Sequence, residues 1–249
     1  MKKVLFATTA LVATAGMAAA DVTFGGYGRF GLLHVGEEGA TAANTDISSR
    51  FQLNITGTAV TDSGVTVGGK LTVEQNDGNT NAFNAAQFFV TSGGMTVRVG
   101  NINGAFDSAP GLYGGSVGFT GLGYGNVVTG FETHDFAAGG QGHAGTREAV
   151  EVVYSMGDVT VHGSHNGTDT EVVVSGSMNG ITAAIGASNT EVATQSELLA
   201  TVGGSFGGVN VGVAYAEAVN GNSHVSLSMG MSIGAATSMS AYVASDEGN

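Results

Sequence analysis

The stretch RFQLNITGTAVTDSGVTVGGKLTVE, residues 50–74, decides the fold. In its first half Phe51, Leu53 and Ile55 share one parity, and polar residues take the other. The second half, from residue 66, repeats the alternation, and TDSG (61–64) separates the two. Alternation with a period of two residues predicts a β-strand with two unlike faces, and a short Gly-containing connector predicts a hairpin.

The same alternation appears in eleven further segments. They are 22–33, 85–92, 95–100, 147–156, 159–166, 171–178, 181–188, 197–206, 209–217, 224–231 and 237–244. With 50–57 and 66–74 they make thirteen predicted strands. Many approach the roughly ten residues that a tilted membrane-spanning strand needs.

The connectors between these segments alternate between short and long. The short ones are 61–64, 93–94, 157–158, 179–180, 207–208 and the turn near Gly234, whereas the long ones are 34–47, 76–84, 101–146, 167–170, 189–196 and 218–223. Short turns at one end and long loops at the other are typical of an all-β, transmembrane antiparallel β-barrel. The alternative is a Gly/Ser/Thr-rich surface or adhesin-like β protein without a channel, but it would have no reason to sort its connectors by length.

The first twenty residues are typical of a cleaved signal peptide. Lys2 and Lys3 precede an uncharged apolar run, 4–17, and Ala18–Ala20 forms an A-x-A cleavage site before Asp21. The barrel is therefore expected over 21–249. Because bacterial single-chain barrels have even strand numbers, we expect at least one C-terminal strand beyond the thirteen, giving 14–16 in the complete barrel.

The composition excludes several classes of protein. Removing Lys2 and Lys3 leaves five of the seven basic residues against twenty acidic ones, a net charge of −15. Nucleic-acid binding would need a basic patch. There is no Cys, so a disulfide framework and a thiolate metal site are also excluded.

No pattern indicates an enzyme or a cofactor. Gly26, Gly28 and Gly31 match a dinucleotide fingerprint in spacing, but they lie within a predicted strand and do not open a helix. The six His show no metal-binding spacing, and His162 and His165 fall on opposite faces of one strand. No pattern marks a particular Ser and His as the nucleophile and base of a hydrolase. We expect a protein that is not an enzyme and holds no cofactor.

The basic residues of the strands share the polar parity, which faces the lumen of a barrel. They are Arg29, Arg50, Lys70, Arg98 and Arg147, and Glu74 and Glu151 share their parity. The 101–146 insert carries Asp107, Glu132 and Asp135. One interpretation is a basic wall facing an acidic loop across a narrow opening, which would set ion selectivity. The alternative is that the basic residues only make the lumen hydrophilic and pair with nearby carboxylates.

The run from Ile47–Arg50 through 61–65 to Lys70, followed by the Gly-rich insert after Arg98, resembles the general diffusion porins of alphaproteobacterial outer membranes. The resemblance implies a water-filled barrel, usually trimeric and of sixteen strands, whose third loop folds inward opposite basic wall residues. It assigns Arg29, Arg50, Lys70 and Arg98 to that cluster and Asp107 to the loop. The resemblance also allows a bound calcium ion, although no motif in this sequence supports one.

We therefore expect an outer-membrane porin that lets small hydrophilic solutes and ions diffuse passively, with loop 101–146 as the constriction. Its expected partners are membrane lipid, two further copies of itself in a homotrimer and the solutes in transit.

Overall fold

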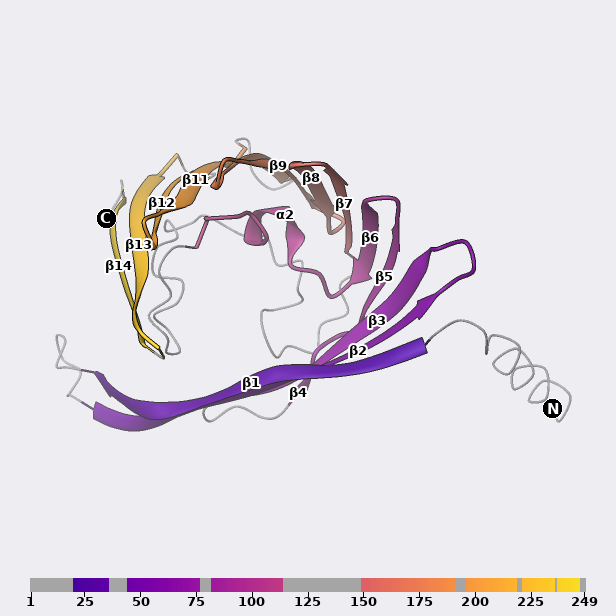
Figure 1. Ribbon diagram of the computed structural model, residues 1–249, viewed down its shortest axis with the longest axis horizontal. Coiled ribbons are helices and arrows are strands. Elements are labelled where there is room, and N and C mark those ends of the chain that lie inside the picture. The colour runs from indigo at the N-terminus through magenta and orange to yellow at the C-terminus, as the bar shows by residue number, and fades with distance from the viewer. Residues whose placement is uncertain are drawn as a thin grey trace, which may run out of the picture.

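The structure is a computed structural model that describes residues 20–35, 44–76, 82–113, 149–190, 196–218, 221–235 and 237–246. In these ranges it consists of one fourteen-stranded antiparallel sheet and a single helical turn (Figure 1). No helix in the described ranges is long and apolar enough to span a membrane.

The strands follow one another in chain order. They are β1 (Ala20–Val35), β2 (Asn44–Val60), β3 (Thr66–Asn76), β4 (Ala82–Phe83), β5 (Gln87–Ser92), β6 (Met95–Gly100), β7 (Val150–Met156), β8 (Val159–His165), β9 (Asp169–Met178), β10 (Ile181–Thr190), β11 (Leu198–Phe206), β12 (Val209–Glu217), β13 (Ser223–Gly234) and β14 (Thr237–Asp246). The helical turn is α2 (Gly104–Asp107).

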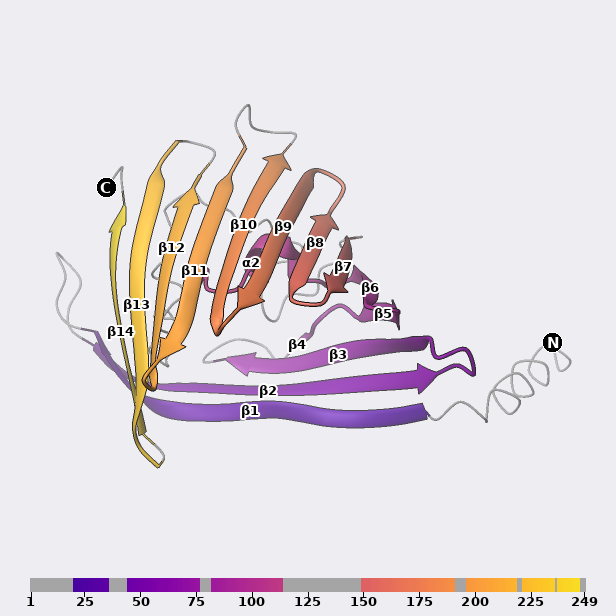
Figure 2. The same cartoon turned by 45° about the horizontal axis from the view of Figure 1, so that its top comes forward.

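Each strand pairs with the next one along the chain, except that β3 pairs with β5 and the two-residue β4 adds to β3. The sheet curves round, and α2 lies inside the curve against β8 and β9 (Figure 1). Figure 2 shows the strands of the second half side by side at a common tilt. Within the described ranges β1 and β14 are the two ends of the sheet and do not pair with each other.

The two faces of the sheet have opposite chemistry. In β7, Val152 and Met156 are exposed by 40% and 54%, whereas Glu151, directly before Val152, is only 4% exposed. The buried parity faces α2, because Ser164 and Glu171 on that parity contact its backbone. Apolar side chains thus line the outside of the curve and the buried ionisable ones the inside, so the predicted all-β antiparallel fold with alternating faces is confirmed.

All thirteen predicted strands are present, but two connectors differ from the prediction. The expected long loop 167–170 is a tight turn, because the Asn166 side-chain oxygen accepts from the backbone N–H groups of Thr168 and Asp169 at 3.1 and 2.8 Å. This closure lets β9 start at Asp169. The expected loop 76–84 contains β4, where Phe83 pairs with Val73.

The segment predicted at 85–92 begins only at Gln87 and places its two adjacent aromatic residues on opposite faces. Phe88 is 59% exposed on the outside. Phe89 lies inside, over Gly68, where a Cβ atom would overlap the Phe89 ring and lie 2.6 Å from the Gly57 carbonyl oxygen. The close approach of backbone and ring explains why a strand interior carries Gly here.

Replacing Gly68 by Val is therefore expected to destabilise the barrel by about 1–3 kcal/mol, the usual range for overpacking. The thermal midpoint of the detergent-folded protein, followed by circular dichroism, measures the loss. The matched control is Gly57→Val on the neighbouring strand, where a Cβ meets no atom within 4 Å. Equal midpoints for the two variants would refute the packing argument.

Candidate functional site

Two arginines face each other on the inner wall of the first hairpin. Arg29 on β1 and Arg50 on β2 are direct cross-strand partners, an arrangement that like charges normally disfavour. Arg50 donates from Nη2 to Glu74 Oε2 at 2.9 Å, and its guanidinium lies 5.7 Å from the centre of the Tyr27 ring. The carboxylate and the aromatic face offset the repulsion and hold Arg50 against the wall.

A second ion pair lies further round the wall, between β6 and β7. Arg98 and Glu151 are cross-strand partners, and Arg98 Nη1 lies 2.6 Å from Glu151 Oε1. The other carboxylate oxygen of Glu151 lies 3.2 Å from His162 Nε2. Glu151 is almost fully buried, so both of its oxygens are used to hold neighbouring side chains rather than facing the lumen.

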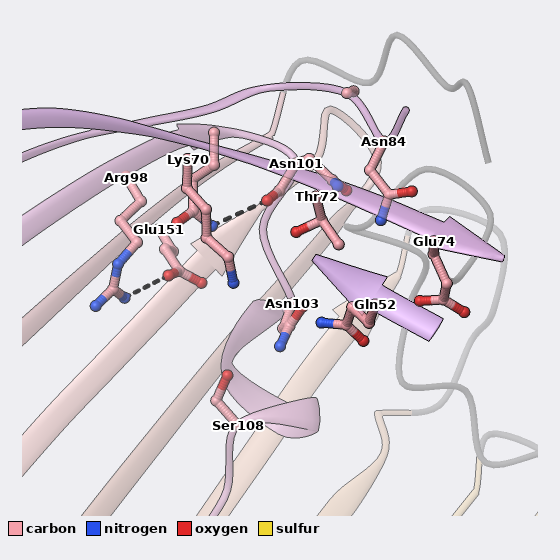
Figure 3. Close-up of a pocket in the computed structure, with 12 residues that line it drawn as sticks. Gln52, Lys70, Thr72, Glu74, Asn84, Arg98, Asn101, Asn103, Ser108 and Glu151 are labelled. Atoms are coloured by element: carbon pink, nitrogen blue, oxygen red, sulfur yellow. Dashed lines mark hydrogen bonds and ion pairs between the residues drawn. The ribbon is translucent and has the colours of Figure 1, made fainter. Parts of the chain in front are cut away.

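Between these two pairs lies a polar cavity of about 370 Å³ (Figure 3). It is lined by Gln52, Lys70, Thr72, Glu74, Asn84, Ala85, Gln87, Arg98, Asn101, Asn103, Ser108 and Glu151. Strands β2, β3, β5, β6 and β7 supply one side, and the first residues of the 101–146 loop supply the other. Lys70 forms no hydrogen bond or ion pair within the described part of the chain.

The start of the loop is fixed to the inner wall through the first turn of α2. The backbone N–H of Ala105 donates to Ser164 Oγ, and that of Phe106 donates to Glu171 Oε2, each at 2.9 Å. Asn103, which precedes the helix, provides no side-chain cap. The wall therefore satisfies donors that a helix start leaves unpaired, and it does so with a negative charge that the helix dipole favours.

Packing adds to these hydrogen bonds. Phe106 is fully buried in a cluster that includes Val173 and Leu199 of the wall. Its ring fits over Gly186, where an added Cβ would lie 3.0 Å from the Phe106 Cε1 atom. Thr201 also donates to the Pro110 carbonyl oxygen at 2.5 Å. Residues 101–113 thus lie on the inner face of the sheet, as predicted for the start of an inward-folding loop.

Asp107 lies in this segment but does not line the cavity. The Tyr113 hydroxyl donates to its Oδ1 atom at 2.7 Å. Burial raises the pKa of the Asp107 carboxyl above its ordinary value, and the bond from Tyr113 opposes that rise. The proposed role of Asp107 as a constriction charge therefore remains a prediction.

The structure brings together five of the predicted residues, which line or border one cavity: Arg50, Lys70, Glu74, Arg98 and Glu151. For Arg50 and Arg98 the arrangement is the alternative one, in which basic residues pair with carboxylates of the same wall. Arg147, Glu132 and Asp135 lie outside the described residues. The described ranges contain no group of three His, Cys, Asp or Glu that could hold a metal ion, and calcium stays a prediction from the resemblance.

Sequence reasoning did not single out Ser164 and Glu171, although a signal for them exists. Both have lumen parity, and they face each other across β8 and β9. Their pairing follows once the turn at Asn166 is recognised, because a tight turn fixes the register of the hairpin. The sequence places His162 on one face of its strand, but its contact with Glu151 depends on the register of β7 and β8.

An antiparallel sheet that curves round a charged interior and presents aliphatic and aromatic side chains outward defines a transmembrane β-barrel. Comparison with known proteins specifies the barrel further. The sequence pattern of the Gram-negative porin family matches residues 7–247, and the chain belongs to this family. Membership indicates a protein of the Gram-negative outer membrane.

Individual relatives agree with this assignment. The chain is 36% identical over 155 residues to a protein named porin from Fuscovulum blasticum, in an alignment that covers 61% of this chain and 54% of the relative. The chain thus spans about half the length of that relative. A solved mutant of the Rh. blastica porin superposes with a TM-score of 0.77 at 26% identity, covering 91% of this chain and 85% of the other. A triple mutant of the Rhodopseudomonas blastica porin gives a TM-score of 0.73 at 26% identity over the same shares of the two chains.

Proposed function

We propose that the chain forms a water-filled channel through which small hydrophilic solutes and ions diffuse passively. The observation that carries the proposal is the division between the two faces of the sheet. Ionisable side chains and the polar cavity occupy the inner face, whereas the outer face exposes apolar side chains from nearly every strand. A polar interior needs water, and an apolar exterior of this extent is stable in lipid.

We propose further that loop 101–146 narrows the channel. Its first residues, 101–113, are held on the inner wall by the Ser164 and Glu171 contacts and by the Phe106 packing. A segment fixed there takes up part of the cross-section of the lumen. Solutes would then pass between the loop and the wall of β1–β6, next to the polar cavity.

Three further features belong to the same proposal. Export with cleavage after Ala20 is supported by the basic and apolar segments that precede it. Assembly as a homotrimer is supported by the resemblance to general diffusion porins. Transport without a cofactor is supported by the passive nature of diffusion, which needs no chemical step.

Planar-bilayer recording tests the channel directly. The folded full chain, added from detergent, is expected to give discrete, ohmic conductance steps that scale with the KCl concentration, because a water-filled lumen conducts like a short column of electrolyte. Heat-unfolded protein at the same concentration is the control and should give none. Bilayers that stay silent with protein shown to be folded by circular dichroism would contradict the proposal.

A further inference from the structure

We propose that the polar cavity beside Lys70 is a saturable binding site for a hydroxylated carboxylate of the size of a hexuronate. The inference deepens the proposed function, on which it rests for its physiological meaning, by naming a solute class that the channel would hold during passage. It is carried by the balance of charge in the cavity and by polar groups that have no partner there.

The charges of the cavity wall cancel except at one position. Glu74 is paired with Arg50, and Glu151 is paired with Arg98 and contacts His162. Both carboxylates are therefore compensated, and their side chains are only 1% and 4% exposed. Lys70 is the lining cation without a carboxylate partner in the described part of the chain. The cavity thus has an excess positive charge although the whole chain is strongly acidic.

The rest of the lining consists of amides and hydroxyls with unused hydrogen-bonding capacity. Asn84 is only 9% exposed, and its Oδ1 atom is buried without a hydrogen-bond partner in the described structure. A buried acceptor of this kind is uncommon in a folded protein and requires a reason. The side chains of Asn103 and Ser108, on the loop side of the cavity, likewise make no hydrogen bond within the described ranges.

The two kinds of group occupy different ends of the cavity. Lys70 and Arg98 lie at one end, and Glu74 and Asn84 lie at the other, with Asn103 between them (Figure 3). Lys70 and Glu74 are four residue steps apart on β3, a distance of about 13 Å along the strand. A ligand that fills the cavity therefore meets an uncompensated cation at one end, and over the rest it meets amides, hydroxyls and the Glu74 carboxylate, whose charge Arg50 compensates.

This arrangement selects among small hydrophilic solutes. A carboxylate beside Lys70 gains a charge-assisted hydrogen bond, and sugar hydroxyls supply both donors and acceptors for Asn84, Asn103 and Ser108. The volume of about 370 Å³ falls within the range of about 300–1,000 Å³ that small-molecule sites show. An amino sugar would meet Lys70 with a like charge, and a simple fatty acid would leave the amides unpaired.

Isothermal titration of the folded full chain in detergent, at low ionic strength, tests the site without relying on conductance. Glucuronate is expected to bind with a Kd at least about tenfold lower than that of glucose or glucosamine, which match its size but not its charge. Propionate, which carries the charge without the hydroxyls, should also bind at least about tenfold more weakly. Equal affinities for glucuronate and glucose would overturn the proposal.

Two substitutions locate the binding site. Lys70→Gln should weaken glucuronate binding by about tenfold or more, whereas Lys70→Arg should keep it within about threefold. Thr182→Glu on β10 is the control. Like Lys70→Gln it lowers the net charge by one, but at another position of the inner wall, and it should leave the Kd for glucuronate unchanged. If Lys70→Gln and Thr182→Glu weaken glucuronate binding equally, the overall charge of the lumen attracts the ligand and there is no specific site. This result would overturn the inference.

Conductance separates this inference from the proposed function. In a conducting bilayer, glucuronate should reduce the current in a saturable way, and Lys70→Gln should remove the block. Conductance steps without block or binding would refute the site and leave the channel intact. Binding by a folded protein that never conducts would support the site and refute the channel.

Discussion

Phe106→Ala is expected to release the start of the loop and raise the single-channel conductance. Phe106 is fully buried against the wall, and truncating a buried Phe costs about 3–5 kcal/mol. That cost exceeds the net contribution of one hydrogen bond of the α2 start, about 1.5–3 kcal/mol for a bond to a charged acceptor. The packing is therefore the largest single contact that holds the segment, and without it the loop should leave the lumen for part of the time.

The same contact can be broken from the wall. Gly186→Leu fills the space that the Phe106 ring occupies, since even a Cβ there would lie 3.0 Å from that ring. Both variants should give larger and more variable conductance steps than the parent chain. Phe206→Ala, which truncates a 58% exposed Phe on the outer face, is the control and should not change conductance. Unchanged steps in both inner variants would mean that the segment does not narrow the channel.

Glu151→Gln is expected to shift the channel towards anions. The substitution removes the carboxylate that holds Arg98 and contacts His162, so a cation that is one-third exposed faces the lumen without its partner. A unit charge at roughly 6 Å in water changes the free energy of a passing ion by about 0.7 kcal/mol. Chloride is favoured and potassium is disfavoured by this amount, so the chloride-to-potassium permeability ratio should rise about tenfold.

The reversal potential in a KCl gradient measures this ratio. Glu217→Gln makes the same change in net charge on the outer face of β12 and should leave the reversal potential unaltered. Adding Arg98→Gln to Glu151→Gln should return the potential towards that of the parent chain, because the unpaired cation is then absent. If Glu151→Gln and Glu217→Gln shift the potential equally, the wall pairs do not set selectivity.

The positions and faces of the strands could be predicted because a barrel strand faces lipid on one side and water on the other. Apolar and polar residues therefore alternate with a period of two along each strand. Val152 and Met156 against Glu151 show this in β7 as clearly as Phe51 and Leu53 against Gln52 do in β2. Arg50, Lys70 and Arg98 could be assigned to the inner wall by the same parity. This information is local, since each assignment needs only the neighbouring residues.

The partners of these side chains could not be predicted, because partners depend on register between strands. Arg98 and Glu151 form an ion pair although the whole of the 101–146 insert separates them in the sequence. The start of the loop contacts Ser164 and Glu171, which belong to strands further along the chain. The tight turn after Asn166 was missed for a related reason. Its closure depends on side-chain hydrogen bonds, which the apolar pattern does not record.

The measurement that tests the central claim most directly is the swelling of liposomes that contain the folded full chain, in a series of uncharged sugars of increasing size. A water-filled channel narrowed by loop 101–146 predicts rapid swelling with a pentose, slower swelling with a hexose and none with a long oligosaccharide. Replacing residues 104–140 by a short Gly/Ser linker should then admit larger sugars. The absence of swelling with the pentose, from protein that is folded in the liposomes, would contradict the account.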